Sequence, residues 1–134
     1  EFLALAESLR FIGQKHSDAK LAALTAALDI ANDAYLDNSK EPGRKAGEPD
    51  NKASHFFVAQ YWAKALAEGA DAELAAKFAP VAKALTENEA QIMEELLCVE
   101  GKAQDIGGYY HPDDAKAEAA MRPSATLNAI IDSI

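Results

Sequence analysis

The chain has 134 residues, and its 13 Lys and Arg against 22 Asp and Glu give a formal net charge of −9. This length suits one domain, and the acidity argues against a dedicated nucleic-acid binder, which would present a basic face. No apolar run is long enough for a transmembrane helix, and the single cysteine, Cys98, excludes a disulfide framework and a cysteine-built zinc site. We therefore expect one domain in a reducing, cytoplasmic setting, with neither nucleic acid nor membrane as a partner.

Alanine dominates the apolar composition, with 30 residues, whereas Leu, Ile, Val and Phe together number 28. Because alanine favours helices but buries little surface, we expect a helical chain with a thin core. Glu1, Phe2 and Leu3 already follow a helical pattern with no capping residue before them. From this we expect a segment cut from a longer polypeptide.

Two helices are predicted before the first long loop. Apolar residues at three-to-four spacing indicate an amphipathic helix over residues 1–14, which Gly13 is expected to end. Ser17 and Asp18 are capping residue types for a second helix, whose apolar stripe runs from Leu21 to Tyr35.

Residues 37–50 form a long polar stretch with two prolines and two glycines, and such loops are usually functional or disordered. The cations between residues 40 and 52 are Lys40, Arg44, Lys45 and Lys52, and the anions are Glu41, Glu48 and Asp50. The stretch is thus locally positive, and the planar guanidinium of Arg44 can grip a phosphate with two hydrogen bonds. We treat residues 37–50 as a candidate functional loop, and a flexible, solvated loop remains the simpler alternative from composition alone.

A third helix is predicted from about Asn51 to Glu68, and its aromatic residues suggest that it is the central element. Asp71 caps a fourth helix, in which Pro80 should produce a kink or a break. Thr86 and Glu89 have the spacing of a capping box for a fifth helix.

Gly101 is the expected stop of the fifth helix, and residues 102–112 are predicted to form an extended loop. A short helix is expected to start at Pro112 and to break before Pro123, and Ser124 caps a final helix. The sequence therefore predicts an all-α fold of five to seven helices.

No catalytic constellation or metal site is expected within the chain. It lacks a phosphate-binding glycine loop, a dinucleotide fingerprint and a nucleophile elbow. His16, His55 and His111 have no metal-ligand spacing, although His55 could reach a ligand held by the preceding loop. The paired carboxylates at Glu94 and Glu95 are expected to lie on a solvated surface or to complement a helix dipole, and the same holds for the pairs Glu87 and Glu89, and Asp113 and Asp114. We expect Cys98 to be a small buried hydrophobic residue.

Four blocks of the sequence carry a family resemblance. Residues 42–57, PGRKAGEPDNKASHFF, are similar to the PSRKVGELDNRGSHFY segment of monomeric NADP-dependent isocitrate dehydrogenases. Residues 59–67, 105–113 and 121–128 resemble further stretches of that family, and the blocks follow one another in order over nearly the whole chain. The chain therefore resembles the C-terminal part of that family.

The resemblance implies a helical segment over residues 1–134 of a larger α/β oxidoreductase that decarboxylates isocitrate to 2-oxoglutarate and CO2. NADP and Mg2+ or Mn2+ are the implied cofactors, and the rest of the parent polypeptide is the implied partner. The metal-binding aspartates, the isocitrate-binding arginine and the catalytic Lys/Tyr pair are implied to lie upstream, so this segment alone is expected to be inactive.

Arg44 corresponds to the family's arginine near the 2′-phosphate of the cofactor and is the one site residue that the resemblance transfers. The loop around it departs from the family pattern, because Gly43 replaces serine, Pro49 replaces leucine and Lys52-Ala53 replaces Arg-Gly. The alternative to an enzyme segment is a non-enzymatic helical interaction module, derived from such an enzyme by truncation.

Overall fold

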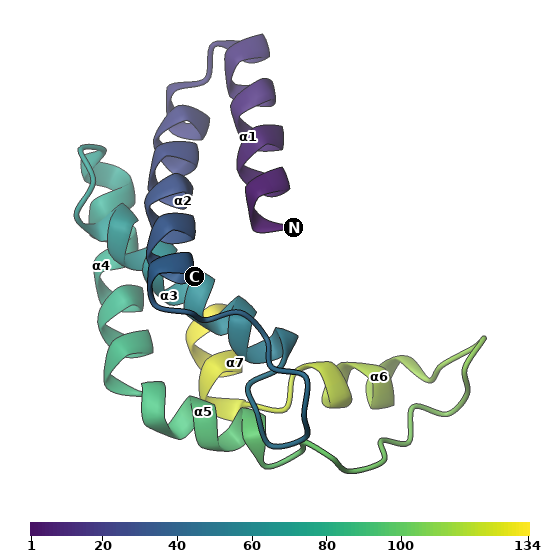
Figure 1. Cartoon of the computed structure of the whole chain (residues 1–134). Coiled ribbons are helices and arrows are strands. Elements are labelled where there is room, and N and C mark those ends of the chain that lie inside the picture. The colour runs from purple at the N-terminus through teal and green to yellow at the C-terminus, as the bar shows by residue number, and fades with distance from the viewer.

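The computed structural model describes all residues from 1 to 134 and contains seven helices and no strands, which confirms the predicted all-α fold (Figure 1). The helices are α1 (Phe2–His16), α2 (Ala19–Asp37), α3 (Asn51–Ala67), α4 (Ala72–Glu87), α5 (Glu89–Leu97), α6 (Asp114–Met121) and α7 (Ala125–Asp132). None of them combines the length and the apolar character that a bilayer crossing requires.

Helix α3 is the central element of the fold, as its aromatic residues predict. It packs against α2 and against α4, while α1 pairs with α2 as an antiparallel hairpin (Figure 1). The last helix, α7, packs across α4 and α5. Helix α6 buries none of its residues and extends to one side together with the loop that precedes it.

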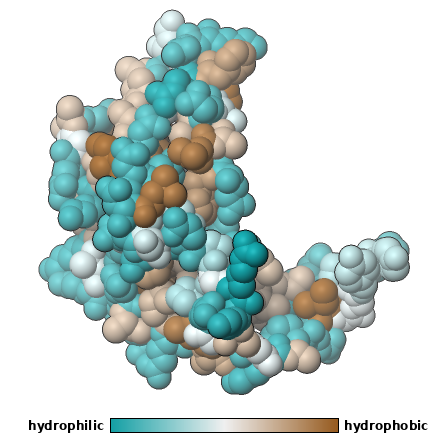
Figure 2. Space-filling view, in the orientation of Figure 1, coloured by the Kyte–Doolittle hydropathy of each residue, from teal (hydrophilic) through white to brown (hydrophobic).

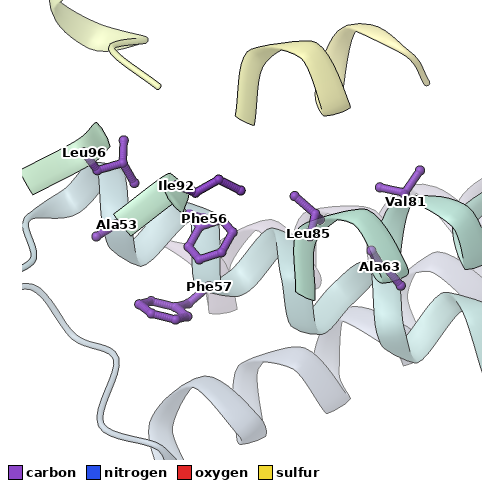
Figure 3. Close-up of a cluster of buried hydrophobic side chains, with 9 residues drawn as sticks. Ala53, Phe56, Phe57, Ala63, Val81, Leu85, Ile92 and Leu96 are labelled. Carbon is purple, nitrogen blue, oxygen red and sulfur yellow. The ribbon is translucent and has the colours of Figure 1, made fainter. Parts of the chain in front are cut away.

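The largest buried cluster joins α3, α4 and α5 (Figure 3). Phe56 and Phe57 of α3 lie with their ring centroids 5.0 Å apart, and Phe56 is almost completely buried. Leu85 of α4 and Ile92 of α5 complete the cluster from the other helices. Burial of such side chains contributes about 1.5–3 kcal/mol each, so this cluster is the main source of stability on this side of the fold.

The core is thin, as the alanine content predicts. Only 23 of the 134 residues are buried, and seven of the seventeen buried apolar residues are alanines. Leu3, Phe11 and Ile30 expose 62%, 66% and 60% of their surfaces. In the space-filling view, hydrophobic areas accordingly interrupt the hydrophilic surface of α1 and α2 (Figure 2).

Three predicted helix caps are confirmed. The carboxylate of Asp18 accepts from two backbone N–H groups in the first turn of α2, and Asp71 does the same for α4. The hydroxyl of Ser124 accepts from the Leu127 N–H at the start of α7. Helix α6 starts at Asp114 rather than at Pro112, since Asp113 is its capping residue.

Gly13 does not end α1, contrary to the prediction. The helix continues to His16, and Ser17, in the left-handed conformation at φ 54°, caps it. Gly13 is buried, and a Cβ at this position would lie 3.2 Å from the Cβ of Leu21 in α2. This glycine therefore permits the close approach of two helices.

Helix α4 is continuous from Ala72 to Glu87, so Pro80 does not break it. The sequence predicts a kink or a break at Pro80, and the kink stays a prediction.

Two predictions for the start and end of α5 are wrong. The capping box does not form, because the Thr86 hydroxyl donates to the Ala82 carbonyl inside α4 at 2.8 Å. Glu89 instead accepts a 2.9 Å hydrogen bond from the Gln60 amide of α3. Helix α5 ends at Leu97, four residues before the predicted stop at Gly101.

Candidate functional site

The candidate site is the irregular segment of residues 38–50, since α2 includes Asp37; we call it the 38–50 loop. It connects the end of α2 to the start of α3, and Ala46 lies against Gly101, beyond the end of α5 (Figure 1). Strongly hydrophilic residues cover this part of the surface in the space-filling view (Figure 2). The loop is thus an exposed element that joins α2 to α3 and contacts the segment after α5.

The first residues of the loop are attached to α2 and α3. The Lys40 N–H donates to the Tyr35 carbonyl at 3.1 Å, and the Lys40 carbonyl accepts from the buried Ser54 hydroxyl at 2.9 Å. The Lys40 ammonium lies 4.2 Å from the centroid of the Phe57 ring, within the range of a cation–π contact. Lys40 is therefore a structural residue of the loop.

The last residues of the loop are attached to α3 by charge. Asp50 caps α3, accepting from the Lys52 N–H at 2.8 Å, and its carboxylate also pairs with the Lys52 ammonium. Burial acts to raise the pKa of Asp50, but the hydrogen bonds with Lys52 and Glu100 and the charge of Lys52 together outweigh it and hold this pKa below its usual value. Burial raises the pKa of Glu100, whose carboxylate is 3.6 Å from the same ammonium, and neighbouring Asp50 adds to the shift. The Lys52 ammonium therefore already has carboxylate partners within the chain.

The tip of the loop is closed by a ring of hydrogen bonds. The Gly43 N–H donates to the Pro49 carbonyl at 2.7 Å, and the Glu48 N–H donates to the Lys45 carbonyl at 3.1 Å. Oε2 of Glu48 accepts from the backbone N–H groups of Arg44 and Lys45, at 3.0 and 3.2 Å. A Cβ at Gly43 would overlap Cβ and Oε2 of Glu48, so this contact needs glycine there.

Two of the four cations between residues 40 and 52 have no partner in the chain. Arg44 and Lys45 are exposed, and their side chains take part in none of the hydrogen bonds or ion pairs that involve Lys40 and Lys52 or any other residue. A guanidinium on a closed loop keeps all five of its N–H donors for an external acceptor. Its planar fork suits a phosphate, which accepts two parallel hydrogen bonds from it.

The histidines do not join this loop in a common site. His55 lies one turn after the start of α3, where its Nδ1 is 2.6 Å from the Asn51 carbonyl and its Nε2 is 3.4 Å from a Glu1 carboxylate oxygen. His16 and His111 are exposed on other elements. The chain brings together no group of three or more His, Cys, Asp or Glu side chains that could hold a metal ion.

A cleft of about 540 Å³ lies beside the loop, between α3, α5 and α7. Its lining is mainly apolar, and its charged residues already have partners in the chain. Arg122 donates to Asp132 at 2.8 Å and to Asn128 at 3.2 Å, and Lys52 is paired with Asp50. The cleft thus offers no unpartnered cation, whereas the 38–50 loop offers two.

Two side chains near α5 make contacts that the sequence does not reveal. Glu95 is not simply solvated, because its carboxylate accepts from the Ser124 hydroxyl at 2.6 Å and from the N–H and hydroxyl of Thr126 at 3.0 and 2.7 Å. Gln91 adds a further hydrogen bond at 3.0 Å. Cys98 is exposed rather than buried, and its thiol donates to the Glu95 carbonyl.

Glu48 is the residue of the candidate site that the sequence did not reveal. In the sequence, Glu48 is only one of three anions of the loop. In the structure, its carboxylate binds two backbone N–H groups and so organises the tip. The available signal was its position one residue after Gly47 and five after Gly43, because glycines on both sides of a carboxylate allow the backbone to wrap around it.

Comparison with known proteins identifies close relatives. The family model described as monomeric isocitrate dehydrogenase matches residues 1–132. The chain is 51% identical over 132 residues to the NADP isocitrate dehydrogenase of Azotobacter vinelandii and 50% identical over 135 residues to that of Corynebacterium efficiens. These matches cover 98% and 100% of this chain but 18% of each relative. The chain therefore spans less than a fifth of the length of these relatives.

Proposed function

The chain belongs to the monomeric isocitrate dehydrogenase family, and from this membership we propose that it serves as a helical segment of an NADP-dependent isocitrate dehydrogenase. The complete enzyme would oxidise isocitrate with NADP and release 2-oxoglutarate and CO2. In it, residues 1–134 would supply scaffold and one contact to the cofactor. The substrate isocitrate and most of NADP would be held by the rest of the polypeptide, the partner of this segment.

The observation that supports the proposed cofactor contact is the unpartnered guanidinium of Arg44 on a closed loop. The loop is attached at both ends, by Lys40 and Asp50, so little conformational entropy would be lost when an anion binds. The 2′-phosphate is the group that distinguishes NADP from NAD. A fixed arginine is the side chain best suited to bind it, since the guanidinium stays charged and donates two parallel hydrogen bonds.

The residues of this chain do not fit a Mg2+ or Mn2+ site. Both ions prefer several oxygen ligands around one point, and the chain gathers no three acidic or histidine side chains in that way. We therefore assign the metal ligands and the catalytic groups of the proposed enzyme to residues outside this segment. The segment alone is expected to turn over no isocitrate.

Substitution of Arg44 by alanine in the complete enzyme tests this function. Loss of a charge-assisted phosphate contact at an exposed loop is expected to cost about 1–3 kcal/mol, so the KM for NADP should rise about 5- to 150-fold. The KM for isocitrate should change little, and any turnover measured with NAD should be unaffected because NAD has no 2′-phosphate. The matched control is Lys15→Ala, which removes an exposed cation at the far end of α1.

An Arg44→Lys variant sharpens the test, because lysine keeps the charge but loses the bidentate geometry. We expect its KM for NADP to lie between those of the wild type and Arg44→Ala. An unchanged KM for NADP in Arg44→Ala would remove this residue from the cofactor site. Equal losses with NADP and NAD would show that the 2′-phosphate is not its ligand.

A non-enzymatic helical interaction module is the second candidate, and the exposed apolar side chains favour it. Leu3, Phe11 and Ile30 of α1 and α2 form surface that a partner could cover. Immunoblotting of the source cells with an antibody against α3 separates the two candidates. A band of about five times the mass of this chain supports the enzyme segment, and a band near 14.3 kDa supports the module.

A further inference from the structure

We infer that Glu48 is a positioning residue for Arg44: its carboxylate gathers the backbone of the loop tip and so presents the guanidinium to the cofactor phosphate. This inference rests on the proposed function for its ligand, although the loop geometry behind it does not. Glu48 itself would not touch NADP.

The central contact is one oxygen that binds two successive backbone amides. Oε2 of Glu48 lies 3.0 Å from the Arg44 nitrogen and 3.2 Å from the Lys45 nitrogen. Successive N–H groups that converge in this way form a concave anion-binding turn. Here the Glu48 carboxylate occupies this turn. Its hydrogen bonds with the two N–H groups hold the loop closed, and these groups are not available to an external anion.

The surrounding contacts show that this closure is a built feature of the loop. The Glu48 N–H donates back to the Lys45 carbonyl, and the Gly43 N–H closes the outer ring on the Pro49 carbonyl. Gly47, at φ +88°, makes the turn that brings Glu48 over the two amides. A Cβ at position 43 would overlap the Glu48 side chain, so this contact requires glycine there.

The closure also determines where the charges of the tip lie. The Glu48 carboxylate accepts hydrogen bonds from backbone amides and forms no ion pair with a side chain. The Arg44 guanidinium therefore stays unpaired although an anion lies only four residues away. Without Glu48 the tip would sample many conformations, and binding would then include the entropic cost of ordering it.

Glu41 provides a matched control for Glu48. It is a glutamate of the same loop, it is exposed, and its side chain makes no hydrogen bond or ion pair. Glu41→Ala and Glu48→Ala therefore change the net charge of the loop equally, and only the second removes the contact to the amides. Glu48→Gln keeps an acceptor oxygen and should restore part of the closure.

The first experiment needs no cofactor. Amide–water exchange of Arg44 and Lys45 is measured by NMR in the 134-residue chain and in its variants. Both amides should exchange at least fivefold faster in Glu48→Ala, be unaffected in Glu41→Ala, and be intermediate in Glu48→Gln. Unchanged exchange in Glu48→Ala would overturn the inference whatever the enzyme does.

The second experiment uses the complete NADP-dependent enzyme. Glu48→Ala should raise the KM for NADP about fivefold with little change in kcat, and this effect should disappear when Arg44 is already alanine. The same rise in both backgrounds would mean that Glu48 does not act through Arg44, and the inference would fail. If Arg44→Ala alone leaves the KM for NADP unchanged, the proposed cofactor contact fails, and the exchange data still decide the role of Glu48 in the loop.

Discussion

Replacement of Glu95 by glutamine is expected to weaken the attachment of α7 to α5 in a pH-dependent way. The Glu95 carboxylate of α5 accepts hydrogen bonds from Ser124 and Thr126 at the start of α7. Negative charge at a helix N-terminus is favourable, since the free N–H groups there carry partial positive charge. Glutamine retains one acceptor oxygen and loses the charge.

The size of the effect follows from the pKa of Glu95. The hydrogen bond from Ser124, with those from Gln91 and Thr126, lowers the pKa of this carboxyl from 4.5 to about 2. Such a difference corresponds to at most about 3 kcal/mol at 1.36 kcal/mol per pH unit. Water competes at this partly exposed site, so we expect Glu95→Gln to cost about 1–2 kcal/mol near pH 7.

The sign of the pH dependence follows from the same shift. The pKa of this carboxyl is lower in the folded state than in the unfolded state. The stabilisation from its ionised form is therefore complete above about pH 5. It decreases as the pH falls from about 4.5 and is lost near pH 2. The wild type and Glu95→Gln should therefore converge in acid.

Urea unfolding followed by far-UV circular dichroism measures both free energies of unfolding across this pH range. Glu94→Gln is the control, since Glu94 is the exposed neighbour whose side chain makes no hydrogen bond. Its difference from the wild type should stay within about 0.5 kcal/mol at every pH. A gap between wild type and Glu95→Gln that stays constant from pH 7 to acid would show that the charge of Glu95 does not stabilise the contact between α5 and α7.

Two glycine substitutions test the close contacts of the fold. Gly43→Ala should push the Glu48 carboxylate off the loop tip, so NMR should show amide exchange at Arg44 as fast as in Glu48→Ala; exchange like that of the wild type would contradict this contact. Gly13→Val should force α1 away from α2 and lower the free energy of unfolding by about 1–3 kcal/mol in urea titrations, and no loss would mean that the helices have room for a side chain.

The helix starts could be predicted because their signals are local. Asp18, Asp71 and Ser124 each bond to a backbone N–H only two or three residues later, so the cap and its partner appear in one stretch of sequence. The central position of α3 was also predictable, since a helix dense in aromatic side chains must bury them against more than one neighbour. Local chemistry was sufficient for these features.

Two of the differences between prediction and structure have one physical cause, which is a partner in another helix. Gly13 matches the pattern of a helix stop, but it lies against Leu21 of the next helix. Glu95 matches a solvated surface residue, but its hydrogen-bond donors lie 29 and 31 residues later. The type of a residue and its immediate neighbours in the sequence do not reveal such contacts, because they form only when whole helices pack together.

The helical class, the thin alanine-rich core and the exposed cationic loop with Arg44 can all be predicted from the sequence, because composition, spacing and charge act within a few residues. Which of the cations between residues 40 and 52 already have partners depends on how the helices pack. Lys40 is held over Phe57 and Lys52 beside Asp50, while Glu48 closes the tip and leaves Arg44 free. The reason is geometric. A charged side chain is paired within the chain only if folding brings a suitable partner within hydrogen-bond distance.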